Sequence, residues 1–131
     1  MGQYYLIVNL DKKEYIKPHA FGDGAKLLEF GSSSCGTMNA LALLLASGNG
    51  RGGGDLQSSN SIIGSWAGNR IVVAGDYDDP NKFLSGDDEL ENEGLCLYTV
   101  ASGQYKNISG AIKECMCEDV YIKANLASKH F

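Results

Sequence analysis

The feature that most constrains the fold is an apolar run between two clusters of small residues. Residues 37–47 (TMNALALLLAS) follow the turn GSSSCG at 31–36 and precede the glycine-dense segment 48–54. Such a run is apolar on nearly every side of a helix, and it is too short to cross a bilayer. The sequence therefore predicts one helix over about residues 37–47 that is buried at the centre of a folded domain.

Short strand-like runs and turns make up most of the remaining chain. β-branched and aromatic residues gather between turn residues, which is typical of strands, at 3–10, 14–17, 26–30, 62–66, 70–74, 95–101, 104–108 and 120–124. A second, short helix is predicted over 110–117, with Ser109 as its N-cap. We expect an α+β fold in which a mixed, mostly antiparallel sheet of five to seven strands packs on the central helix. With 131 residues, the chain is expected to form a single globular domain over residues 1–131.

The net charge of the chain limits the kinds of partner that it is expected to bind. The formal net charge is −5, whereas a nucleic-acid duplex needs a basic face, so no duplex is expected as a partner. A small anion in a local pocket stays compatible with this charge. The first residues lack the basic flank and long apolar run of a signal peptide, which predicts a cytoplasmic protein without a membrane partner. A homo-oligomer is left open, and no cofactor is predicted.

The four cysteines are expected to be reduced thiols that are buried as small apolar residues, because the chain shows no export signal. The alternative is a zinc site built from Cys96, Cys115, Cys117 and His130. The Cys-x-Cys spacing differs from the usual Cys-x2-Cys knuckle, and no second knuckle is present. We therefore predict no metal site.

Four longer sequence motifs within residues 1–80 indicate a resemblance to a known family. They are MGQYY…NLDKKEY, PHAFGDGAKLLEFG, GNGRGGGDL and GSWAGNRIVVAGDYDDP. On these motifs the chain resembles an uncharacterised family of small bacterial and phage-type proteins. The resemblance implies one intact domain and marks the loops that matter. It implies no activity, cofactor or catalytic residue.

The turn before the central helix is the first candidate site. Backbone N–H groups at a helix start have no partner within the helix, and the helix dipole adds positive potential there. Small side chains let an anion approach, and hydroxyl groups can donate hydrogen bonds to it. The alternative is that these residues only cap the helix and allow close packing. The candidate ligand-binding residues are Ser32, Ser33, Ser34, Cys35, Gly36 and Thr37.

Two further segments are predicted to complete this site. Arg51 lies in the glycine-dense segment and can clamp an anion bidentately, unless it is only a solubilising residue of a surface loop. Trp66 and Tyr77 offer aromatic planes for a base, with Arg70 nearby in the sequence. Asp76 offers an acceptor for ribose hydroxyls or base amines. The alternative for this segment is a core tryptophan and an acidic turn.

The leading hypothesis is binding, and thereby sequestration, of a small anionic, nucleotide-derived ligand without turnover. The first alternative is a hydrolase or transferase in which Cys35 or a serine is the nucleophile, His19 the base and Asp23 its orienting group. The second alternative is a protein-interaction module, such as a phage-encoded inhibitor of a host defence protein. That module would act through the acidic run at 87–93, which is otherwise most simply a solvated loop.

Overall fold

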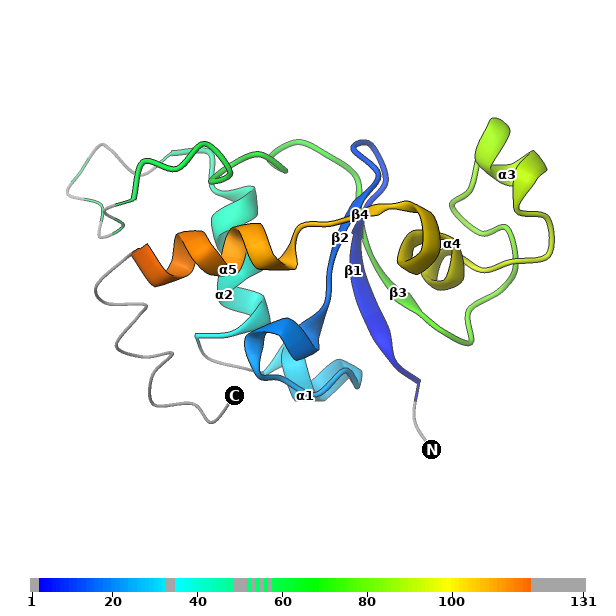
Figure 1. Cartoon of the computed structure of the whole chain (residues 1–131), viewed down its shortest axis with the longest axis horizontal. Helices are drawn as coiled ribbons and strands as arrows, with labels where there is room; N and C mark the ends of the chain where they lie inside the picture. Colours follow the sequence, from blue (N-terminus) through cyan, green and yellow to red (C-terminus); the bar gives the residue numbers. More distant parts are fainter. Residues whose placement is uncertain are drawn as a thin grey trace.

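The computed structural model describes residues 3–32, 35–48, 52, 54, 56 and 58–118. In these residues one open sheet of four strands, in the order β3-β1-β2-β4, is flanked by five α-helices and one 3-10 helix (Figure 1). The elements are, in chain order, β1 (Tyr5–Asn9), β2 (Glu14–Ile16), η1 (Pro18–Phe21), α1 (Leu27–Gly31), α2 (Thr37–Leu45), β3 (Ile71–Gly75), α3 (Asp87–Glu91), α4 (Leu97–Gln104), β4 (Lys106–Asn107) and α5 (Ser109–Glu118). The predicted α+β class is confirmed.

β1 is the strand around which the sheet is built. It pairs antiparallel with β2 and with β3, so that Ile7 lies opposite Ile16 on one side and opposite Val73 on the other. β2 pairs in parallel with β4, which makes the sheet mixed and mostly antiparallel as predicted. The last four residues of β1 are all buried. A strand that is covered on both faces reads as a nearly continuous apolar run, and β1 does so.

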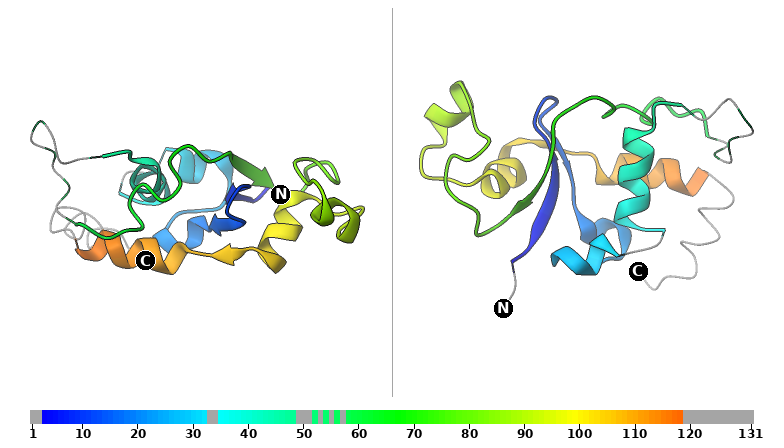
Figure 2. Two further views of the ribbon diagram at one scale, coloured as in Figure 1. Left: turned by 90° about the horizontal axis from the view of Figure 1, so that it is seen from above. Right: turned by 180° about the vertical axis from the view of Figure 1, so that it is seen from behind.

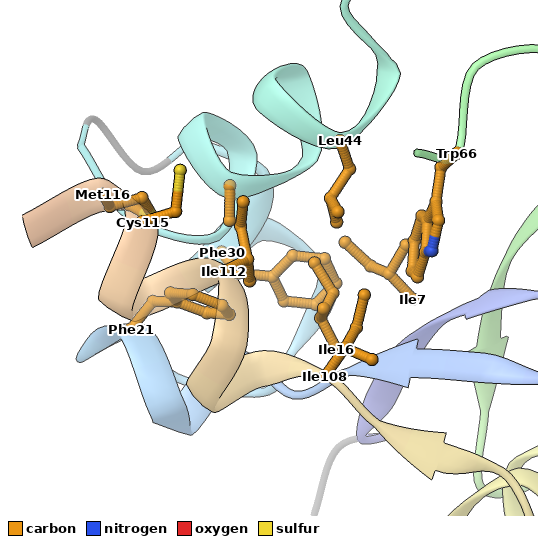
Figure 3. Packing of buried hydrophobic residues seen from close by; sticks show 11 residues of the cluster. Ile7, Ile16, Phe21, Phe30, Leu44, Trp66, Ile108, Ile112, Cys115 and Met116 are labelled. Carbon is orange, nitrogen blue, oxygen red and sulfur yellow. The ribbon is translucent and has the colours of Figure 1, made fainter. Parts of the chain in front are cut away.

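The two faces of the sheet support separate hydrophobic cores. Because side chains alternate along a strand, Leu6 and Val8 belong to the core beneath α4, whereas Ile7 belongs to the core formed with η1, α2 and α5. Figure 2 shows these helices on opposite sides of the sheet. The larger core, shown in Figure 3, consists of Ile7, Ile16, Phe21, Phe30, Ala40, Leu44, Trp66, Ile108, Ile112, Cys115 and Met116. The smaller core consists of Leu6, Val8, Tyr15, Ala74, Leu84, Leu97, Val100 and Ala101.

The prediction of five to seven strands is wrong for the described residues, partly because residues 26–30 start a helix. The Lys26 N–H group donates to Glu29 Oε1 at 3.0 Å, a capping-box contact that favours a helix start over a strand. Residues 62–66 form turns instead of a strand. The strand predicted at 120–124 lies outside the described residues.

The run at 95–101 is also a helix where a strand was predicted. Leu97, Val100 and Ala101 are the buried residues of α4, and they follow the i, i+3, i+4 spacing of a helix face. Alternating apolar and polar residues are expected of a half-buried strand, and this spacing differs from that pattern. The strand predicted at 104–108 is present only as the two-residue β4.

The central helix α2 forms where it was predicted, but it is covered on one side only. Its buried residues are Thr37, Ala40 and Leu44, which form a single stripe. Ala42 is exposed, and Leu45 retains 38% of its accessible surface. The prediction that this helix is buried on nearly every side, as the one central helix on which the sheet packs, is therefore wrong. α2 packs on α1 and α5 and is one of five α-helices among the described residues.

The turns at residues 61–68 close the C-terminal end of α2. The Gly64 N–H group donates to the Leu43 carbonyl at 2.9 Å. The Trp66 N–H group donates to the Leu44 carbonyl, also at 2.9 Å. The last carbonyls of a helix lack the usual partner within it, and here the Leu43 carbonyl also accepts the N–H group of the C-cap residue Ala46 at 3.4 Å. Gly64 has a φ of 77°, and a Cβ atom there would collide with the Ala46 carbonyl oxygen, so glycine is required.

We expect Gly64→Ala to lower the free energy of unfolding by about 2–4 kcal/mol, because the collision adds to the strain of a positive φ. Gly68→Ala is the matched control, since Gly68 has a φ of 83° but a Cβ atom there meets nothing within 4 Å. Only the backbone strain of about 1–2 kcal/mol remains in the control. Urea denaturation measures both losses, and equal losses would contradict the role assigned to Gly64.

Asp88 ties α3 to the rest of the molecule, so the acidic run is not only a solvated loop. Its carboxylate forms an ion pair with Lys13 at 3.1 Å and accepts a hydrogen bond from the Tyr105 hydroxyl at 3.1 Å. Burial raises the pKa of Tyr105 from 10.0 to about 12, and the negative charge and hydrogen bond of Asp88 act in the same direction. Folding therefore favours the neutral form of Tyr105.

The raised pKa of Tyr105 predicts a loss of stability in alkali. Its contribution is fully present below pH 10.0 and is lost as the pH rises towards about 12, because the unfolded chain releases this proton first. We expect Tyr105→Phe to remove this part of the pH dependence, whereas other titrating groups affect both proteins alike. Denaturant titrations at a series of pH values measure the difference. Parallel stability curves for the two proteins would show that the pKa is not raised.

Candidate functional site

A pocket of about 310 Å³ lies between the β2–β4 side of the sheet, the start of α5 and the turns that precede β3. Three segments that are far apart in the sequence form its wall. The pocket is lined by Lys12, Glu14, Ser61, Ile62, Ser65, Lys106, Asn107, Ile108 and Ala111. Most of these side chains are polar or charged, so the pocket offers hydrogen-bonding groups to a ligand.

Two lysines of the pocket have no carboxylate partner in the part of the chain that the structure describes. Among the described residues, the ammonium groups of Lys12 and Lys106 form no hydrogen bond and no ion pair. By contrast, Lys13, Arg70 and Lys82 each pair with an aspartate. Among the lining residues the two lysines outnumber the one carboxylate, that of Glu14, in a chain whose net charge is −5. A local field of this kind favours an anion.

The N-terminus of α5 lies at the same pocket. α5 begins at Ser109, which confirms the helix predicted over 110–117, and both Asn107 and Ala111 line the pocket. The Asn107 Oδ1 atom accepts a hydrogen bond from the Ser109 N–H group at 2.9 Å. Ser109 is not the cap that was predicted, because its hydroxyl accepts a bond from the Lys17 N–H group at 2.8 Å. The positive end of the α5 dipole adds to the charge of the lysines.

Glu14 places one carboxylate in the pocket wall. Its Oε1 atom accepts a hydrogen bond from Trp66 Nε1 at 2.8 Å. Trp66 is fully buried in the larger core (Figure 3), so Glu14 is bonded to a side chain of the protein interior. The predicted stacking of a base on Trp66 is not available in this arrangement, because the ring is covered by protein. Glu14 instead provides a fixed acceptor in the wall of the pocket.

The helix start that was predicted to hold an anion is occupied by the protein's own carboxylate. Asp23 is 8% exposed, and its Oδ2 atom accepts bonds from the Thr37 N–H group at 2.7 Å and from the Thr37 hydroxyl at 2.6 Å. The two groups would otherwise be buried and unpaired, since Thr37 is fully buried. Asp23 thus takes the place of a bound anion at α2.

The other residues of that turn do not form an open site in the described structure. Ser32 ends α1, where its hydroxyl donates to the Leu28 carbonyl at 2.6 Å. Gly36 is buried, and Cys35 is half-buried with a φ of 56°. The predicted ligand-binding residues Ser33, Ser34 and Arg51 lie outside the described residues.

The structure separates Arg70 from Asp76 and Tyr77. Arg70 precedes β3 and pairs with Asp11 at 2.9 Å, which lowers the pKa of the Asp11 carboxyl through hydrogen bonds from Arg70. Asp76 follows β3 and accepts a bond from the Tyr4 N–H group at 3.0 Å. Tyr77 is 74% exposed. At a rise of about 3.3 Å per residue, the six-residue step from Arg70 to Asp76 spans roughly 20 Å. These predicted residues therefore do not form one site.

Among the described residues, no arrangement of side chains supports the enzymatic or the metal-binding alternative. The His19 side chain is exposed and forms no hydrogen bond there, while Asp23, its predicted orienting group, bonds Thr37. Cys96 packs beside α4, whereas Cys115 lies in the core on the other face of the sheet. In the part of the chain that the structure describes, no three histidine, cysteine or acidic side chains cluster as metal ligands.

Sequence reasoning did not identify the lining of the pocket. Lys12, Ser61 and Lys106 come from separate turns and strand ends, and each is an ordinary surface residue in its local sequence. The only usable signal was the predicted hairpin at residues 3–17, which brings Lys12 to one end of the sheet. The parallel pairing of β2 with β4, which adds Lys106, has no local signature.

Comparisons with known proteins identify no relative of this chain. No protein family, curated protein or solved structure matches this chain. The family resemblance based on sequence motifs therefore stays a prediction. Within the described ranges, no helix is long and apolar enough to cross a membrane.

We expect Asp23→Ala to lower the free energy of unfolding by about 2–4 kcal/mol, because the Thr37 amide and hydroxyl lose a charged acceptor inside the protein. Asp79→Ala is the matched control. Asp79 is exposed, and its carboxylate bonds no described residue, so its loss should change stability by less than about 0.5 kcal/mol. Chemical denaturation measures both. A loss for Asp23→Ala no larger than that of the control would show that the carboxylate does not hold α2.

Proposed function

We propose that this protein binds a small anionic, nucleotide-like ligand in the pocket beside the α5 N-terminus, without turnover. The observation that carries the proposal is that Lys12 and Lys106, on one pocket of about 310 Å³, have no partner among the described residues. A volume near the lower end of the ~300–1,000 Å³ range of ligand sites suits one small molecule. The leading hypothesis from the sequence is thereby kept, but it moves from the α2 start to the α5 start.

The pocket favours a ligand that carries both an anionic group and a hydrogen-bond donor. A phosphate or carboxylate near Lys12 and Lys106 gains charge-assisted hydrogen bonds. The carboxylate of Glu14 would repel a second anionic group but accepts bonds from a hydroxyl or an amine. The Ser61 and Ser65 hydroxyls can bond either part. A nucleoside monophosphate combines these features, since its phosphate is anionic and its ribose and base carry donors.

Binding is a better account of the pocket than catalysis. Nucleophilic catalysis needs a hydroxyl or thiol within hydrogen-bond reach of a base. Neither the Ser61 nor the Ser65 hydroxyl bonds a basic side chain among the described residues. The carboxylate of Glu14 is held by the indole of Trp66 as an acceptor. These contacts support recognition of a ligand and give no activated nucleophile.

Titration with nucleoside monophosphates and with inorganic phosphate tests the proposal. The chain contains one tryptophan, and its indole is bonded to the pocket residue Glu14, so Trp66 fluorescence reports occupancy directly. We expect saturable binding by calorimetry and a rise in thermal stability, equivalent to about 2.7 kcal/mol at a ligand concentration of 100 times Kd. Binding should weaken as ionic strength rises, because the contact is largely electrostatic.

Lysine variants locate the site. We expect Lys12→Ala and Lys106→Ala each to weaken binding about tenfold or more, the loss typical of a hydrogen bond to a charged group. Lys17→Ala is the control, because Lys17 is exposed, carries the same charge and does not line the pocket. Equal weakening by all three variants would indicate a non-specific charge effect. An absence of saturable binding for every phosphate compound would overturn the proposal.

A further inference from the structure

The sheet ends in an open apolar strand. β3 lies at one end of the strand order and pairs only with β1 among the described strands. The view from behind in Figure 2 shows β3 at the outer side of β1. β3 reads IVVAG, and Val73 retains 40% of its accessible surface at this edge. A strand in this position presents backbone groups to whatever approaches it.

The register shows which backbone groups of β3 face outward. The Leu10 N–H group donates to the Arg70 carbonyl, and the Asp76 N–H group donates to the Tyr4 carbonyl, so the even-numbered residues of β3 bond β1. The N–H and C=O groups of the odd-numbered residues therefore point away from the sheet. The Gly75 carbonyl accepts a bond from its own chain, from the Asp78 N–H group at 3.2 Å.

Five outward groups of β3 remain without a partner in the described structure, namely the N–H and C=O of Ile71 and of Val73 and the N–H of Gly75. The devices that usually protect such an edge are missing from β3, which contains no charged residue, no proline and no bulge. The opposite edge of the sheet differs, because β4 is only two residues long and begins with Lys106. Of the two edges of the described sheet, the β3 edge is therefore the one suited to pairing.

We infer that β3 is the interface for a second copy of this chain, paired antiparallel across a two-fold axis at Val72. In this register Ile71 lies opposite the partner's Val73, and Val73 lies opposite the partner's Ile71. The N–H and C=O groups of Ile71 and Val73 in each chain then bond, because both residues form hydrogen-bonded pairs in an antiparallel ladder.

A second copy fits this edge better than an arbitrary strand for two reasons. The open groups are self-complementary about Val72, with donors and acceptors matched by the two-fold axis. The register also opposes no like charges, since Arg70 faces the partner's Ala74 and Asp76 faces the partner's Gly68. Pairing covers the exposed Val73 and uses up the open edge, so the product is a closed dimer rather than a filament.

Sedimentation equilibrium of the full chain tests this inference, together with amide hydrogen exchange. We expect a mass twice that of one chain, with a transition to monomer on dilution. The Ile71 and Val73 amides should be protected in the dimer and become exposed on dilution. The Val72 and Ala74 amides are the internal control, because they bond β1 in both states.

Val73→Pro is the decisive variant, because proline removes an N–H group that faces outward and leaves the pairing of β3 with β1 intact. We expect this variant to be monomeric with an unchanged circular dichroism spectrum. Val73→Lys, which keeps the N–H group but places a charge at the edge, should also be monomeric. A monomeric wild-type chain, unlimited growth in mass, or a dimer that survives both substitutions would overturn the inference.

Discussion

The burial of β1 on both faces is the constraint on which the rest of this structure depends. Leu6 and Val8 need a cover on one face, and Ile7 needs a cover on the other. A single layer of helices cannot satisfy both requirements, so α4 packs on one side and α2, α5 and η1 gather on the other. The burial of these side chains contributes about 1.5–3 kcal/mol each relative to exposure. As an interior strand of the sheet, β1 thus requires a three-layer arrangement in this chain of 131 residues.

Both ends of α2 are completed by contacts from outside the helix. Asp23 supplies the acceptor at its start, and the Gly64 and Trp66 amides supply donors at its end. A helix of nine residues is marginal on its own, because forming its first turn is unfavourable. These contacts explain how so short a helix persists with one side exposed. They also explain why its start does not serve as an anion site, since a buried carboxylate already occupies it.

The proposed ligand site and the proposed dimer edge lie at different parts of the same sheet. The pocket belongs to the β2–β4 side and the α5 start, whereas the open edge belongs to β3. Trp66 connects the two regions structurally, because its indole bonds Glu14 in the pocket and its chain leads within five residues into β3. Each proposal nevertheless rests on its own groups. The ligand-site proposal rests on the charge of the two lysines, and the dimer proposal rests on the unpaired backbone groups of β3.

Local pattern was enough to predict the elements whose apolar spacing is unambiguous. The helix near residues 37–47, the helix near 110–117 and the strands at 3–10, 14–17 and 70–74 all have counterparts in the structure. The helices at 27–31 and 97–104 were missed because runs of five to eight residues fit a strand and a helix about equally well, and only packing distinguishes them. The pocket escaped prediction for a related reason. Its lysines, carboxylate and hydroxyls are ordinary surface residues in their own segments, and they meet only because β2 pairs with β4 and the turn at 61–66 docks on α2. Long-range pairing leaves no periodic trace in a sequence, since it depends on which surfaces remain to be covered once each element has formed.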